Sequence, residues 1–110
     1  MGIKVERIDQ AAVIEVSGRL DMNTSPDLRQ RALSLYARGH CRSLTIDFTN
    51  VSHIDTAGLA TLLEIQLAAG EHCAHLNLSG LSDRVRYLIE VNGLTGFLGI
   101  VNPAREKLTA

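Results

Sequence analysis

The chain has 110 residues, of which 45% are hydrophobic and only 4% aromatic, and its formal net charge is −1. This length predicts one domain, residues 1–110, with an aliphatic core. The near-neutral charge and the few aromatic side chains argue against a nucleic-acid partner. No apolar run reaches the ~18 residues of a membrane span and no secretory signal is visible, so we expect no direct membrane insertion and a cytoplasmic location.

The first part of the chain predicts a β-hairpin followed by a helix. Apolar residues indicate strands over residues 3–8 and 11–18, and the segment between them is short enough for a hairpin turn. Ser25 followed by Pro26 is typical of a helix N-cap and first helical position, and Gly39 is typical of a residue that ends a helix. We therefore expect the first helix to lie between these positions.

The rest of the chain predicts alternating strands and helices. Three further strands are expected over residues 43–49, 74–78 and 98–101. Three further helices are expected from Thr56 to Ala69, ended by Gly70; after the cap Ser82; and briefly after Asn102. In the helix from Thr56, an apolar stripe is expected to face the core; it consists of Leu59, Leu62, Leu63 and Leu67.

The order of these elements predicts an α/β fold built on a mixed sheet. The strand over residues 43–49 alternates apolar with polar side chains, which is typical of a sheet that helices cover on one face only. The strand–helix–strand units require parallel neighbours, while the initial hairpin adds an antiparallel pair.

The stretch HIDTAGLATLLE, residues 53–64, places small and polar residues at the start of an apolar helix. The carboxylate of Asp55 is expected to cap backbone N–H groups there, and the hydroxyl of Thr56 can also cap. Gly58 has no side chain, so another backbone or a partner can approach it closely. A helix start favours an anion by ~0.3–1 kcal/mol, so a phosphate on a hydroxyl is physically reasonable there. From the residues alone, capping is favoured over an active role.

Two cysteines and nearby histidines raise the question of a metal site. The spacing of His72, Cys73 and His75 does not match zinc-binding patterns, and Cys41 lies in a separate predicted turn. We therefore expect no metal, no cofactor and two buried thiols. Because no serine has a nucleophile context such as G-x-S-x-G, we also expect no enzymatic activity.

Three segments resemble the STAS domain family of bacterial anti-sigma-factor antagonists: VSGRLDMNTSP, IDFTNVSHIDTAGLATLL and SGLSDRVRYLIEVNGL. The resemblance covers nearly the whole chain. It implies a regulatory, non-catalytic module that docks on an ATP-handling protein partner. The partner-binding residues that it implies are Asp21, Asp55, Thr56, Ala57, Gly58 and Leu59.

The resemblance leaves three interpretations open. In the anti-sigma branch, the partner is an anti-sigma factor kinase that phosphorylates a hydroxyl just before the motif glycine, where this chain has Ala57. Small STAS subunits of lipid-transport ABC complexes, which bind an ABC-type ATPase subunit, carry an Asp-Thr-small-Gly-Leu sequence similar to residues 55–59. The third interpretation is a phosphorylation-controlled switch with Thr56 as the candidate phosphoacceptor, one residue before the usual position.

Overall fold

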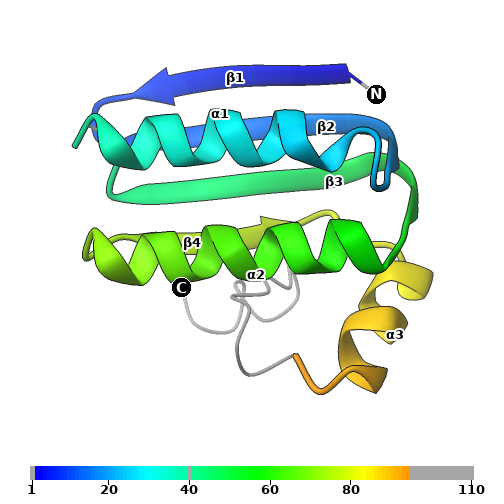
Figure 1. Cartoon of the computed structure of the whole chain (residues 1–110). Coiled ribbons are helices and arrows are strands. Elements are labelled where there is room, and N and C mark those ends of the chain that lie inside the picture. Colours follow the sequence, from blue (N-terminus) through cyan, green and yellow to red (C-terminus); the bar gives the residue numbers. More distant parts are fainter. Residues whose placement is uncertain (1, 40, 95–110) are drawn as a thin grey trace, which may run out of the picture.

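The computed structural model describes residues 2–39 and 41–94, which form a mixed four-stranded sheet with helices packed on it (Figure 1). The strands lie in the order β1-β2-β3-β4; β1 pairs antiparallel with β2, and the other two pairs are parallel. The predicted α/β fold is thus confirmed. The elements in chain order are β1 (Gly2–Ile8), β2 (Ala11–Leu20), α1 (Ser25–Ala37), β3 (Ser43–Ile54), α2 (Thr56–Glu71), β4 (His75–Ser79) and α3 (Asp83–Val91). The strand expected over residues 98–101 and the helix expected after Asn102 lie outside the described residues.

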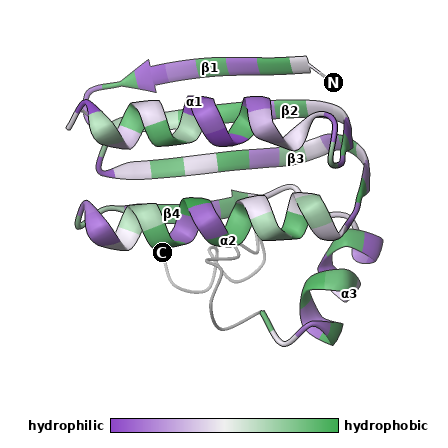
Figure 2. Ribbon diagram, viewed as in Figure 1, coloured by the Kyte–Doolittle hydropathy of each residue, from purple (hydrophilic) through white to green (hydrophobic). Residues whose placement is uncertain are grey.

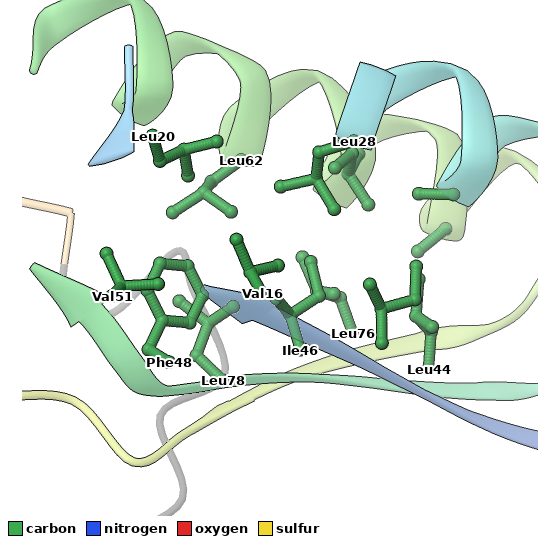
Figure 3. Close-up of a cluster of buried hydrophobic side chains, with 14 of the residues drawn as sticks. Val16, Leu20, Leu28, Leu44, Ile46, Phe48, Val51, Leu62, Leu76 and Leu78 are labelled. Carbon is green, nitrogen blue, oxygen red and sulfur yellow. The ribbon is translucent and has the colours of Figure 1, made fainter. Parts of the chain in front are cut away.

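The core lies between one face of the sheet and the helices α1 and α2. Hydrophobic and more polar residues alternate along β3 (Figure 2), and the side chains of Leu44, Ile46 and Phe48 are buried toward the helices. Leu28 from α1 and Leu62 from α2 point into the same cluster (Figure 3). Polar residues of the opposite sheet face are only half-buried, for example Glu15, Thr45 and Asp47. The prediction of a sheet covered mainly on one face is therefore correct.

The parallel pair β2–β3 is longer than the sequence predicted. Both strands continue past the expected ends to the register pair Leu20↔Ile54, through two register shifts in the ladder. Gly18 has φ +88°, a conformation that glycine adopts without strain, and lies at one of these shifts. Because the two strands end together, the residues that follow them begin side by side.

Helix α2 differs from its predicted form in its end and in its buried face. It continues through Gly70 to Glu71, so Gly70 does not end it. Leu67, expected in the core stripe, is 58% exposed, whereas Ile65 and Ala69 are buried. The buried positions 58, 62, 65 and 69 repeat at helical spacing, which turns Leu67 toward solvent.

The ends of the other helices follow the sequence more closely. Ser82 caps α3, as predicted, by accepting a hydrogen bond from the N–H of Val85 at 3.2 Å. In α1, however, the N-cap is Thr24 and the helix already begins at Ser25, which is buried. Within the described part of the chain, no helix is long and apolar enough to cross a membrane.

Candidate functional site

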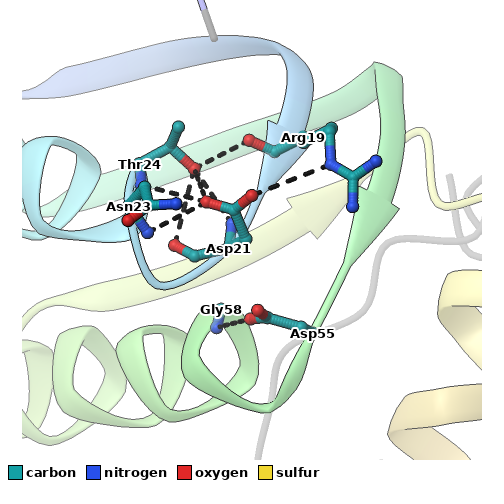
Figure 4. Close-up of polar contacts among 6 residues, drawn as sticks. All are labelled: Arg19, Asp21, Asn23, Thr24, Asp55 and Gly58. Carbon is teal, nitrogen blue, oxygen red and sulfur yellow. Dashed lines mark hydrogen bonds and ion pairs between the residues drawn. The ribbon is translucent and has the colours of Figure 1, made fainter.

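The loop between β2 and α1 is organised by the carboxylate of Asp21 (Figure 4). Its Oδ1 accepts hydrogen bonds from the backbone N–H of Asn23 at 2.9 Å and of Thr24 at 3.2 Å, and Arg19 Nε lies 3.7 Å from Oδ2. The hydroxyl of Thr24 accepts from the Asp21 N–H and donates to the Arg19 carbonyl. The N–H of Asn23, more than the Thr24 and Arg19 contacts, lowers the pKa of Asp21. The carboxylate therefore holds the loop in one shape.

The junction between β3 and α2 is closed by Asp55. Its Oδ1 accepts a hydrogen bond from the backbone N–H of Gly58 at 2.9 Å (Figure 4), so the predicted N-cap is confirmed. Thr56 is the first helical residue, and its side chain is exposed rather than part of this cap. Ala57 follows it and is half-buried.

The backbone of Leu20 connects the β2–α1 loop to the β3–α2 junction. The N–H of Asp55 donates to the Leu20 carbonyl at 3.2 Å. A Cβ atom on Gly58 would lie 2.7 Å from that same carbonyl oxygen and 2.7 Å from Ile54 Cγ1. The sequence predicted that either another part of the backbone or a partner approaches Gly58 closely. In the structure, the backbone of Leu20 does so. Gly58 and its neighbour Leu59 are both buried.

Five residues of the β2–α1 loop and of the start of α2 have exposed or half-buried side chains. We call Asp21, Met22, Asp55, Thr56 and Ala57 the α2-start surface. Met22 is 71% exposed, and sequence analysis did not single it out. The sequence feature that could have indicated Met22 is that it is an apolar residue within the otherwise polar loop DMNTS. Exposed methionine adapts its shape to what it touches, which makes it a suitable contact residue.

The cysteines lie at the other end of α2. Cys41 is buried, as expected, but Cys73 is exposed, so the prediction of two buried thiols is wrong for Cys73. The reason is local: α2 runs two residues further than Ala69, and Cys73 falls in the turn that leads into β4, with φ +53°. Within residues 2–39 and 41–94, no three histidine, cysteine or acidic side chains are arranged to hold a metal ion.

Comparison with known proteins identifies the family. The chain matches the family described as “Mlab, STAS domain” over residues 3–102, and it therefore belongs to the STAS domain family. It is 35% identical over 89 residues to the anti-sigma-B factor antagonist of Listeria monocytogenes, covering 81% of this chain and 77% of the relative. It is 27% identical over 100 residues to the protein of the same name from Staphylococcus aureus, covering 91% and 92%.

Solved structures agree with this assignment. An anti-sigma factor antagonist from Mycobacterium paratuberculosis superimposes with a TM-score of 0.81 at 26% identity, over 98% of this chain and 91% of that one. The anti-sigma factor antagonist SpoIIAA in its unphosphorylated form superimposes with a TM-score of 0.76 at 16% identity, over 98% and 94%. The second likeness concerns the fold alone.

Proposed function

We propose that this chain is an anti-sigma-factor antagonist that binds an anti-sigma factor kinase through the α2-start surface. The names of the relatives from Listeria and Staphylococcus support the class of partner. The observation that supports this site is the contact of Asp55 and Gly58 with the Leu20 carbonyl, which joins the β2–α1 loop rigidly to the start of α2. The exposed side chains of Met22 and Thr56 extend from these two segments.

A rigid frame favours binding because less conformational freedom is lost when the partner docks. The Asp21 hydrogen bonds and the Asp55 cap are already formed in the free protein. The exposed side chains are those of Met22 and Thr56, and the half-buried Ala57 follows Thr56; together they supply apolar contact and one hydroxyl.

In this proposal the chain has no catalytic activity and acts in the cytoplasm by reversible binding. Its carboxylates at the α2-start surface are engaged with backbone N–H groups, as Asp55 is with Gly58. A purified preparation is therefore expected to leave ATP unchanged. Turnover of ATP that disappears in Asp55→Ala would contradict this part of the proposal.

Phosphorylation is the third possibility, and we propose that it does not control this chain. The position before Gly58 is Ala57, which has no hydroxyl. Thr56 is exposed at the start of α2, where the helix dipole tolerates a phosphate, but it lies one residue earlier on the helical turn. Mass spectrometry after incubation with the kinase and ATP decides the question. We expect no stoichiometric phosphate; one phosphate that Thr56→Ala removes would establish the switch.

An ABC-type ATPase subunit is the alternative partner. The sequence Asp-Thr-Ala-Gly-Leu at residues 55–59 favours it, because the small STAS subunits that it resembles carry the same pattern. Affinity purification of the tagged chain from its own host, followed by identification of the bound proteins, separates the two. Recovery of a kinase that also binds a sigma factor supports the antagonist proposal. Recovery of ABC transporter subunits contradicts it and supports the ABC-type ATPase subunit as the partner.

A further inference from the structure

The end of the molecule opposite the α2-start surface brings both cysteines to one cavity. At this end, α2 stops and β3 begins (Figure 1). A cavity of about 170 Å³ lies there, lined by Tyr36, Gly39, Cys41, Arg42, His72 and Cys73. The two cysteines come from different connections, one before β3 and the other before β4.

The strand register explains why both cysteines line this cavity. Ser43 and His75 are register partners in the parallel pair β3–β4, and the His75 N–H donates to the Arg42 carbonyl at 2.8 Å. Cys41 and Cys73 each precede one of these partners by two residues. The register therefore brings the segment that holds Cys41 beside the segment that holds Cys73, and both residues line the same cavity.

The geometry points to a reversible redox site, in which Cys41 and Cys73 form an intramolecular disulfide when the protein meets a peroxide. This inference does not rest on the proposed function. The two thiols differ in exposure, as expected for a pair in which one thiol reacts with the oxidant and the other forms the disulfide. Cys73 is exposed and meets the oxidant, whereas Cys41 is 5% exposed, and burial raises the pKa of its thiol. Cys73 is therefore the residue that is oxidised first, and Cys41 is the one that resolves the product.

The chemistry balances with hydrogen peroxide as the oxidant. The sulfur of Cys73 attacks one peroxide oxygen and breaks the O–O bond, which gives a sulfenic acid and one water. The sulfur of Cys41 then attacks the sulfur of Cys73 and displaces the hydroxyl, which leaves as a second water with the remaining thiol proton. Two thiols are oxidised, one peroxide is reduced to two waters, and the new ring encloses β3 and α2.

Intact-mass measurement of the folded protein after peroxide treatment and thiol alkylation tests this inference. We expect the monomer to lose the mass of two hydrogen atoms, to resist alkylation at both cysteines and to recover both thiols on reduction. In Cys41→Ser, Cys73 is expected to remain open to further oxidation or to alkylation. In Cys73→Ser, Cys41 is expected to remain largely reduced.

A matched control keeps two thiols but separates them. Ser52 is exposed on β3, near the α2-start surface. The double variant Cys41→Ser, Ser52→Cys should therefore form no intramolecular bridge under the same treatment. The inference is overturned if the wild-type monomer keeps two alkylatable thiols, if it forms only intermolecular dimers, or if the control variant bridges equally well.

Discussion

Packing within the protein itself requires glycine at position 58. The Leu20 carbonyl and the Ile54 side chain occupy the space that a Cβ atom would take. Asp55 adds the second constraint, because its side chain caps the same N–H that Gly58 presents. Gly58 is buried and Asp55 is half-buried, so substitution of either residue tests how the start of α2 is held in place more than it tests contact with a partner.

Gly58→Ala should destabilise the protein by about 1–3 kcal/mol, because the added methyl group overlaps a backbone oxygen that cannot move freely. Gly70→Ala is the matched control in the same helix. A Cβ at Gly70 meets no atom within 4 Å, so this change should stabilise the fold by up to about 1 kcal/mol through helix propensity. Urea unfolding of both variants measures the difference. Equal effects of the two substitutions would contradict the packing described at Leu20.

Asp55→Ala should lower the free energy of unfolding by about 1 kcal/mol, the usual effect of losing a helix N-cap. Asp55→Asn keeps a side-chain oxygen that accepts from Gly58 and should cost much less. Thermal unfolding followed by circular dichroism gives the comparison. If alanine and asparagine behave alike, the cap contributes little to the stability of α2.

On the scale of elements, the lengths of β2 and β3 decide where the candidate site lies. The sequence predicted the hairpin, the three described helices and the one-sided sheet from periodicity and from caps such as Ser82. It did not predict that both strands continue to Leu20 and Ile54, because polar residues such as Thr49 and Asn50 interrupt the alternation on β3. The side-by-side placement of Asp21 and Asp55 follows from that continuation and from contacts far apart in sequence.

Helix α2 shows a second limit of periodicity. It is apolar on several sides, so the sequence alone does not fix its rotation. Four leucines fit one predicted stripe, yet Leu62 is fully buried and Leu67 is 58% exposed. Only the packing of Ile65 and Ala69 against the core decides which of them faces solvent.

The rotation of α2 is testable with the same substitution at two sites. Leu62→Ala should cost about 2–5 kcal/mol, because it leaves a cavity in a packed core. Leu67→Ala should change the unfolding free energy by no more than about 0.5 kcal/mol. Chemical denaturation of the two variants provides the measurement, and a large loss at Leu67 would show that α2 is turned differently.

The loop between β2 and α1 should make stability depend on pH. The folded state lowers the pKa of Asp21, chiefly through the N–H of Asn23, so its carboxylate stabilises the fold above the unfolded pKa of ~3.9. That contribution is lost as the pH falls through the lower, folded pKa. Asp21→Asn should therefore be less stable than wild type at neutral pH, with a difference that shrinks in acid. Urea titrations over a pH series check this, and a constant difference would contradict it.

On the scale of the whole molecule, α2 joins two ends with different chemistry. One end holds Asp55 and the accessible residues of the α2-start surface, and the other holds the cavity with Cys41 and Cys73. The sheet and the core between them form one continuous buried cluster. Variants at one end are therefore expected to leave the properties measured at the other end unchanged.

We propose that a protein partner packs on the α2-start surface. The most direct test of this proposal is the affinity of the partner protein recovered by affinity purification for Thr56→Asp and Ala57→Asp, with Ser34→Asp as a control of equal charge. Ser34 is exposed near the far end of α1. Thr56→Asp and Ala57→Asp should fold, because an added carboxylate at the start of α2 changes stability by only about 1 kcal/mol. Ser34→Asp should fold because the side chain of Ser34 is exposed.

Burying an unpaired charge in the interface costs a few kcal/mol, and each ~1.4 kcal/mol is tenfold in affinity. We therefore predict that Thr56→Asp and Ala57→Asp bind this partner at least ~10-fold more weakly, while Ser34→Asp binds like wild type. Unchanged affinity of both folded α2 variants, or an equal loss in Ser34→Asp, would contradict the claim.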